Sequence, residues 1–168
     1  MRHHGGLDKA VHAHFLGHLQ RFSDLAGWSI PRGYLGENLT LASTVADGSL
    51  TEQDFCLGDI VDVGTATLQV SQPRIPCFKQ ADQLKVADLL AIVVREGRTG
   101  RYFRVLKECV LAAGDVLRWR ERPYPQWTIE RLNQFIRFPK DPAAWRELAQ
   151  YPELAIDLRR RAEEWERS

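Results

Sequence analysis

The sequence predicts a predominantly β body up to about residue 121, followed by a tail of three short helices. Two observations support this division. Alternating apolar runs rich in β-branched residues fall before that point, whereas after "RPYPQW" (122–127) only helical patterns follow. A length of 168 residues is enough for one core of ordinary size. We therefore expect a body over 1–121 and a helical segment over 122–168.

The first elements are a strand, a helix and a loop. "DKAVHAHF" (8–15) alternates as a strand does, and "LGHLQRFSDLAG" (16–27) predicts a short helix that ends at Gly27. "WSIPRGYLGEN" (28–38) carries glycine and proline breaks and predicts a loop.

The clearest β signal is "DIVDVGTATLQVS" (59–71), which predicts a hairpin across Gly64-Thr65. A helix is expected over 83–97, where an apolar pattern ends in a basic, glycine-containing stretch. "RYFRVLKECVL" (101–111) and "DVLRWRER" (115–122) predict a second hairpin across residues 112–114.

The tail shows three amphipathic patterns. "TIERLNQFIRF" (128–138) places its apolar residues on one helix face, and "PELAIDLRRRAEEWE" (152–166) repeats apolar residues about every four positions. Between them, Asp141 is a predicted N-cap with Pro142 at the first helical position.

Composition excludes several classes of protein. A formal net charge of +1 argues against a dedicated duplex-binding protein but leaves room for a local basic pocket. No apolar run approaches the roughly 20 residues that span a bilayer, and the start lacks the apolar region of a secretory signal. We expect a cytoplasmic protein with no nucleic-acid or membrane partner.

The three cysteines are too few and too widely spaced for a disulfide framework or a zinc knuckle. Cys56 and Cys109 have apolar neighbours and are expected to be buried packing residues. Cys77 is different, because "SQPRIPCFK" (71–79) holds it in a stiff loop between prolines and basic residues. Nearby Arg74 or Lys79 would favour a thiolate, which attacks electrophiles or ligates soft metals. From composition alone, a reactive and an inert Cys77 are equally supported.

Other polar residues allow two interpretations. His14 and His18 would share a helix face, but the rest of a zinc ligand set is missing, so core or surface histidines are the better interpretation. "HHGGLDK" (3–9) could bring backbone and Lys9 to a phosphate, or form a simple turn. Glu37 and Asn38 could cap a turn or contact a ligand.

Five motifs occur together in one order: "HGGLDKAVHAH", "GENL", "GD" within "CLGDIVDVG", "LQVSQPRIPCFK" and "TGRYFRVL". They resemble the MOSC domain, named for the C-terminal domain of molybdenum cofactor sulfurase. The tail from "RPYPQWTIERLNQFI" resembles the three-helix segment of the bacterial 6-N-hydroxylaminopurine resistance proteins.

This resemblance implies a β-barrel-like body whose pocket binds the molybdenum cofactor, molybdopterin with its metal. Cys77 would be the molybdenum ligand, and Arg74 would act with it in catalysis by meeting anionic groups of cofactor or substrate. Further residues implied around the cofactor are His4, Gly5, Gly6, Lys9, Glu37, Asn38, Gln72 and Arg104.

The activity that the resemblance implies is reduction of N-hydroxylated bases or amines, an oxidoreductase reaction. Because no GxGxxG follows a strand, electrons would come from a separate flavoprotein-type reductase. Two alternatives are a cofactor or persulfide carrier and a non-catalytic fragment. Relatives carry some tens of residues before the HGG motif, which starts here at residue 4, so missing N-terminal strands would leave a sheet edge open and favour a homodimer.

Overall fold

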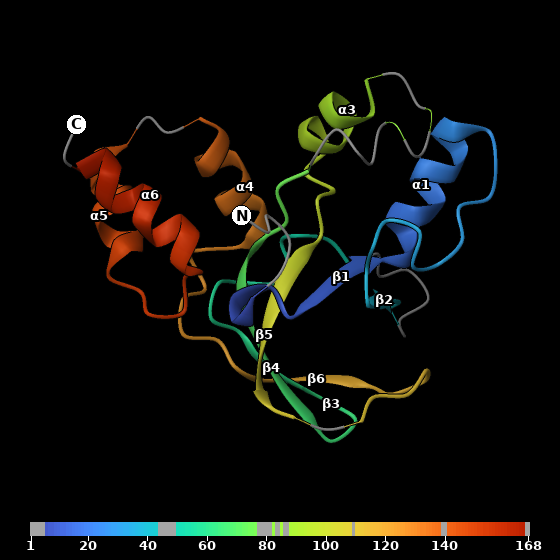
Figure 1. Cartoon of the computed structure of the whole chain (residues 1–168), viewed down its shortest axis with the longest axis horizontal. Helices are drawn as coiled ribbons and strands as arrows, with labels where there is room; N and C mark the ends of the chain where they lie inside the picture. Colours follow the sequence, from blue (N-terminus) through green and yellow to red (C-terminus); the bar gives the residue numbers. More distant parts are fainter. Residues whose placement is uncertain are drawn as a thin grey trace.

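A curled six-stranded sheet forms the body of the protein (Figure 1). The computed structural model describes residues 6–43, 50–76, 82, 85, 88–108, 110–138 and 141–166, without the side chains of residues 90, 165 and 166. The strands are β1 (Val11–Phe15), β2 (Leu39–Leu41), β3 (Ile60–Val63), β4 (Ala66–Pro73), β5 (Arg101–Lys107) and β6 (Leu117–Glu121). Their order across the sheet is β2-β1-β5-β4-β3-β6. Among the described strands, only β1 and β2 pair in parallel.

Helices occupy the two ends of the chain and one long connection of the sheet. They are η1 (Leu7–Lys9), α1 (Leu16–Ala26), α3 (Leu89–Arg95), α4 (Ile129–Arg137), α5 (Pro142–Ala149) and α6 (Ile156–Glu166). Helix α1 ends as predicted, with Gly27 in the left-handed region at φ 73°. Helix α5 begins as predicted, because the Asp141 side chain accepts hydrogen bonds from the N–H groups of Ala143 and Ala144. No helix in the described part of the chain is long and apolar enough to cross a membrane.

The first predicted hairpin is confirmed and the second is wrong. Strands β3 and β4 pair antiparallel across Gly64. Strand β5 instead lies between β1 and β4, while β6 pairs with β3 at the other end of the sheet. The buried Asp59 explains the place of β6, since its carboxylate accepts hydrogen bonds from Trp119 (3.3 Å) and from Arg122 (2.8 and 3.0 Å). These bonds hold β6 beside β3 rather than β5.

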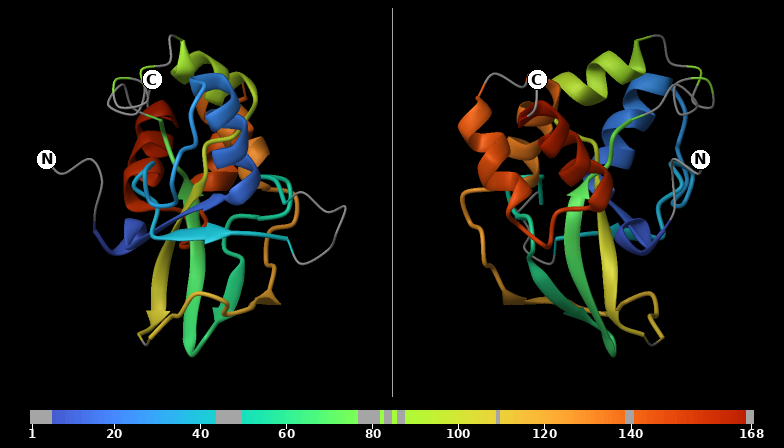
Figure 2. Two further views of the ribbon diagram at one scale, coloured as in Figure 1. Left: turned by 90° about the vertical axis from the view of Figure 1, so that its right-hand side faces the viewer. Right: turned by 60° about the vertical axis from the view of Figure 1, so that its left-hand side comes forward.

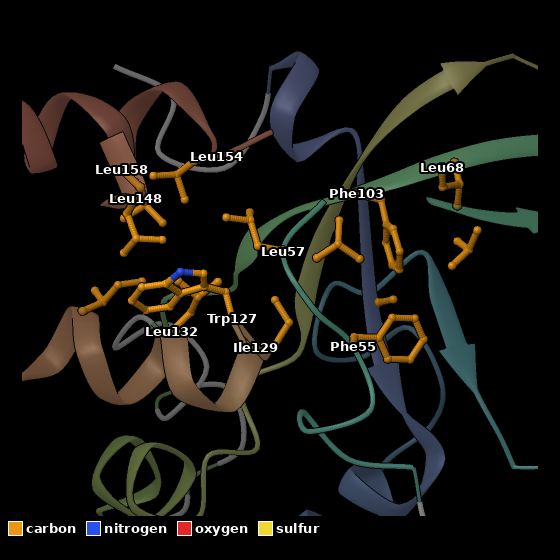
Figure 3. Close-up of a cluster of buried hydrophobic side chains, with 14 of the residues drawn as sticks. Phe55, Leu57, Leu68, Phe103, Trp127, Ile129, Leu132, Leu148, Leu154 and Leu158 are labelled. Atoms are coloured by element: carbon orange, nitrogen blue, oxygen red, sulfur yellow. The ribbon is translucent and has the colours of Figure 1, made fainter. Parts of the chain in front are cut away.

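The main hydrophobic core joins the sheet to the tail (Figure 3). Phe55, Phe103 and Leu68 lie on the sheet side, and Trp127 and Leu148 lie on the tail side. Leu57 and Ile129 stand between the two groups and are fully buried. The predicted division of the chain at residue 121 stays a prediction, but the core itself is continuous across that point.

A second, smaller core places α1 against α3. Figure 2 shows these two helices side by side above the sheet. Leu19 and Phe22 of α1 pack with Leu89 and Val93 of α3. Within the described residues this helix starts at Leu89, later than the predicted start at residue 83.

We expect Leu158→Ala in α6 to lower the free energy of unfolding of the whole chain by about 2–4 kcal/mol, because it opens a cavity in the shared core. Urea unfolding followed by tryptophan fluorescence and by circular dichroism measures this. Arg160→Ala, on the exposed side of the same helix, is the matched control and should change the free energy by less than about 0.5 kcal/mol. Two separate transitions in the Leu158→Ala variant would contradict a continuous core.

Candidate functional site

The chain leaves the sheet at the end of β4 through "RIP" (74–76). The backbone N–H of Arg74 donates to the carbonyl oxygen of Gly100 at 3.0 Å, so this segment is tied to the start of β5. Ile75 is 48% exposed and Arg74 only 7%. Cys77 comes next in the sequence but lies outside the described residues, as do His4 and Gly5. Their predicted roles stay predictions.

Gln72 and Arg74 carry buried polar atoms that no described residue satisfies. Gln72 is 2% exposed, and its Oε1 has no hydrogen-bond partner, while its Nε2 donates to the Pro73 carbonyl at 3.2 Å. Nε and Nη1 of Arg74 also lack a partner among the described residues. Buried polar groups are nearly always hydrogen-bonded, so each such atom calls for an explanation. A bound polar or anionic group would supply the missing partners.

A cavity of about 780 Å³ opens beside this segment, between α3, α4 and α6. Ile75 and Pro76 line one part of the cavity, and its other lining residues include Arg95, Arg137 and Arg161. A smaller cavity of about 150 Å³ adjoins it, since Glu96, Gly97 and Glu130 line both. The larger cavity therefore gives a ligand access to the loop that leads to Cys77.

The predicted basic residues Lys9 and Arg104 are held by acidic side chains. Lys9 pairs with Asp157 of α6 at 2.7 Å. Arg104 donates to Asp8 at 2.6 and 3.0 Å and to Gln69 at 3.1 Å. Both residues thus connect the N-terminal segment with the sheet and the tail, and their predicted contact with the cofactor stays a prediction.

Glu37 caps the turn before β2, one of the two interpretations left open by the sequence, whereas Asn38 bonds to His12 of β1. The Glu37 carboxylate accepts hydrogen bonds from the N–H groups of Gly33 (2.6 Å) and Leu35 (3.0 Å). Oδ1 of Asn38 accepts from the N–H of His12 at 2.8 Å. Gly6 is at φ 103°, which only glycine adopts readily, at the start of η1.

Sequence reasoning missed Arg101, a fully buried cation at the start of β5, where it pairs with Pro73 at the end of β4. Its guanidinium lies 4.0 Å from the Phe15 ring centroid and 3.8 Å from that of Phe55, and its nitrogens have no hydrogen-bond partner among the described residues. Burial lowers its pKa to about 9, against the opposing attraction of Glu52 and other carboxylates. It therefore stays charged at neutral pH. Strand alternation was the available signal, since Arg101 shares a face with the core residue Phe103.

The histidines of β1 and α1 form a second buried polar group. His12, His14 and His18 are 4%, 1% and 1% exposed. The pKa of His14 lies well below its usual 6.5. Burial is the main cause, and the neighbouring His12, His18 and two arginines lower the pKa further. Within the described ranges, no set of three or more potential ligands could hold a metal ion. The three residues are core histidines, one of the alternatives that the sequence allowed.

Cys56 is buried, as predicted for a packing residue. Burial and the nearby Asp59 raise the pKa of its thiol, while Arg122 lowers it less. A protonated thiol is a poor nucleophile and a poor metal ligand, so Cys56 does not compete with Cys77 for either role. Cys109 lies outside the described residues.

The neutral, buried state of His14 makes stability depend on pH. Its pKa is near 6.5 in the unfolded chain and lower in the folded chain, so the unfolded chain binds the proton first as the pH falls. We expect the free energy of unfolding to drop below about pH 6.5 by up to about 1.4 kcal/mol per pH unit from this residue, until the folded pKa is reached. His14→Gln should flatten this slope in urea unfolding at several pH values. An unchanged slope would contradict the assignment.

Comparison with known proteins places the chain in a family. The family model of the MOSC domain matches residues 1–118. A protein named "Reductase" from Gibberella moniliformis is 34% identical in an alignment 141 residues long, which covers 80% of this chain and 24% of that protein. The "Uncharacterized protein YflK" of Bacillus subtilis is 39% identical over 111 residues, 66% of this chain and 48% of YflK. The chain thus spans about half, or less, of the length of these relatives.

Solved structures agree with this match. YiiM from Geobacillus stearothermophilus superposes with a TM-score of 0.87 at 36% identity, covering 96% of this chain and 80% of that one. YiiM from Escherichia coli shares the fold with a TM-score of 0.82 at 23% identity, covering 96% of this chain and 79% of that one. From the match over residues 1–118 and the shared fold, the chain belongs to the MOSC domain family.

Proposed function

We propose that this MOSC protein binds the molybdenum cofactor beside Arg74 and Cys77 and reduces N-hydroxylated bases or amines. The observation that carries the proposal is the buried guanidinium of Arg74, three residues before Cys77 in a MOSC chain, with two nitrogens that no described residue satisfies. A relative named "Reductase", 34% identical over 141 residues, supports the redox class. The family supports a role for molybdenum in general.

The described residues fit such a group. Arg74 offers charged donors for a phosphate or another anionic oxygen, and Oε1 of Gln72 offers an acceptor for a ring N–H. Both side chains are already ordered and buried, so little conformational entropy is lost on binding. Lys9 and Arg104, engaged with carboxylates, are weaker candidates for direct contact.

The reaction converts R–NHOH, two electrons and two protons into R–NH₂ and water. Bound cofactor would supply the two-electron chemistry, and a separate flavoprotein-type reductase would supply the electrons. The protein would bind and orient the substrate in the cavity of about 780 Å³ and hold charge beside the reacting group.

We expect protein purified from a cofactor-producing host to contain about one equivalent of molybdenum per chain. The Cys77→Ser variant should lose this metal, because the Cys77 thiolate is the proposed ligand. Elemental mass spectrometry measures the metal, and reduction of N-hydroxylaminopurine measures activity. Cys56→Ser is the matched control and should keep the metal, because that thiol is buried and donates to the Pro125 carbonyl at 3.6 Å. Sulfane sulfur on Cys77 without molybdenum would favour a persulfide carrier instead.

Arg74→Gln should weaken retention of the cofactor or of an anionic substrate about ten- to a hundredfold, because a charge-assisted hydrogen bond contributes about 1.5–3 kcal/mol. Molybdenum content and KM for the substrate separate the two effects. Arg95→Gln, on α3 in the lining of the cavity, shows how much of the loss comes from the charge of the cavity alone. Unchanged metal content and KM in Arg74→Gln would contradict the proposed role.

A further inference from the structure

Three arginines line the cavity of about 780 Å³ and have no part in the proposed binding of the cofactor. They are Arg95 of α3, Arg137 of α4 and Arg161 of α6, and all three are exposed. We propose that they bind the phosphate of a nucleotide, so that the substrate is an N-hydroxylated nucleoside monophosphate rather than a free base. This inference rests on the proposed reductase function and names the substrate class of the same site.

The carboxylates in the lining of this cavity do not neutralise the three arginines. Glu96 accepts hydrogen bonds from Arg21 at 2.8 and 3.3 Å and from Arg98 at 2.9 Å. Glu130 accepts from Nε2 of Gln53 at 2.7 Å. Within the described ranges, no ion pair or hydrogen bond joins either carboxylate to the three arginines. The cavity therefore keeps an excess of positive charge, which an anionic ligand would offset.

The helix dipoles do not account for this group of arginines. Arg95 and Arg137 lie in the last turns of α3 and α4, where the dipole favours a cation. Arg161 lies in the middle of α6, where the dipole has no such effect. The dipoles also do not explain why cations from three separate helices line one cavity, whereas a shared anionic ligand does.

Each guanidinium keeps N–H donors for a ligand. Nη2 of Arg161 donates to the carbonyl oxygen of Ile136 at 3.3 Å. The guanidinium carbon of Arg137 lies 5.3 Å from the centroid of the Phe138 ring. Arg95 forms no hydrogen bond or ion pair with any residue that the structure describes. A guanidinium has five N–H donors, and those left over match the oxygens of a phosphate, which arginine binds in a bidentate manner.

The rest of the lining suits the base of a nucleotide. Ile75 and Phe138 are 48% and 58% exposed, and together with Pro76 they give the cavity apolar walls. Large apolar side chains that are exposed together are typical of a ligand-binding surface, and a planar base can pack on them. Nδ2 of Asn133 donates to Oγ1 of Thr99 at 2.7 Å, which leaves the amide oxygen to accept an N–H group of the base.

The size of the cavity agrees with a nucleotide. Pockets that bury a drug-sized ligand have volumes of roughly 300–1,000 Å³, and this cavity has about 780 Å³. A free base is neutral and smaller, so it offers the arginines no anionic partner. Ile75 and Pro76 lie between Arg74 and Cys77 in the sequence, so a base packed on them has its N-hydroxylated group next to the proposed site of reduction. Only the N–O bond is reduced, and the phosphate takes no part in the reaction.

Binding of the reaction product tests the phosphate site without turnover. Adenosine 5′-monophosphate is the amine that reduction of its N-hydroxylated form would release, and adenosine is the same ligand without the phosphate. In isothermal titration calorimetry of the purified full chain, we expect adenosine 5′-monophosphate to bind at least about tenfold more tightly than adenosine, because its phosphate forms charge-assisted hydrogen bonds. Equal affinities for the two ligands would overturn the phosphate site.

Arg137→Gln tests the arginines themselves. This variant should weaken binding of adenosine 5′-monophosphate about ten- to a hundredfold and binding of adenosine less than about twofold, and Arg95→Gln should act in the same direction. Arg160→Gln removes the same charge from the exposed side of α6, outside the described lining of the cavity, and as the matched control it should bind both ligands like the wild type. Equal losses for both ligands in Arg137→Gln, or the same loss in Arg160→Gln, would overturn the proposal.

Molybdenum content decides which phosphate the arginines bind, because molybdopterin carries a phosphate of its own. We expect Arg137→Gln to keep the molybdenum content of the wild type and to raise KM for the N-hydroxylated nucleotide about tenfold or more. Loss of the metal would assign the arginines to the cofactor and overturn the substrate class. Wild-type protein without molybdenum would refute the proposed function, while the titrations would still decide whether the cavity binds a nucleotide phosphate.

Discussion

The carboxylate of Asp8 holds three parts of the molecule in one arrangement. Its Oδ1 accepts hydrogen bonds from Arg104 of β5, and its Oδ2 accepts from the backbone N–H of Ile156, the first residue of α6. The N-terminal segment, the centre of the sheet and the last helix therefore meet at one side chain. Because α6 also contributes Arg161 to the larger cavity, this contact helps to place one wall of the candidate site.

The motifs of the family thus divide into two kinds in this chain. Lys9, Arg104 and Glu37 have partners within the fold and build the frame. Gln72 and Arg74 have polar atoms that the described part of the fold leaves unsatisfied. A residue's place in a motif does not show whether it supports the fold or binds a ligand, because the same motifs contain both kinds of residue. The hydrogen-bond partners separate them.

Sequence reasoning succeeded where structure is local. The hairpin at Gly64 and the cap at Asp141 depend on a few adjacent residues, and both were predicted. The place of β6 depends on Asp59, which lies more than fifty residues earlier, so the pattern around residues 112–114 predicted the wrong pairing. Strand alternation indicates that Arg101 faces the core, but its place between two phenylalanines depends likewise on β1 and on the loop before β3, and no local pattern reports that place.

The buried Arg101 places a positive charge in the interior of the protein whether or not a ligand is bound. No described residue forms a hydrogen bond with its guanidinium. Because its pKa is about 9, the positive charge persists through the physiological pH range. A fixed positive potential near Arg74 would attract anions and repel amines that have gained a proton. In the proposed reduction of an N-hydroxylated amine, the amine product is more basic than its hydroxylated precursor, so this potential would help to expel a protonated product.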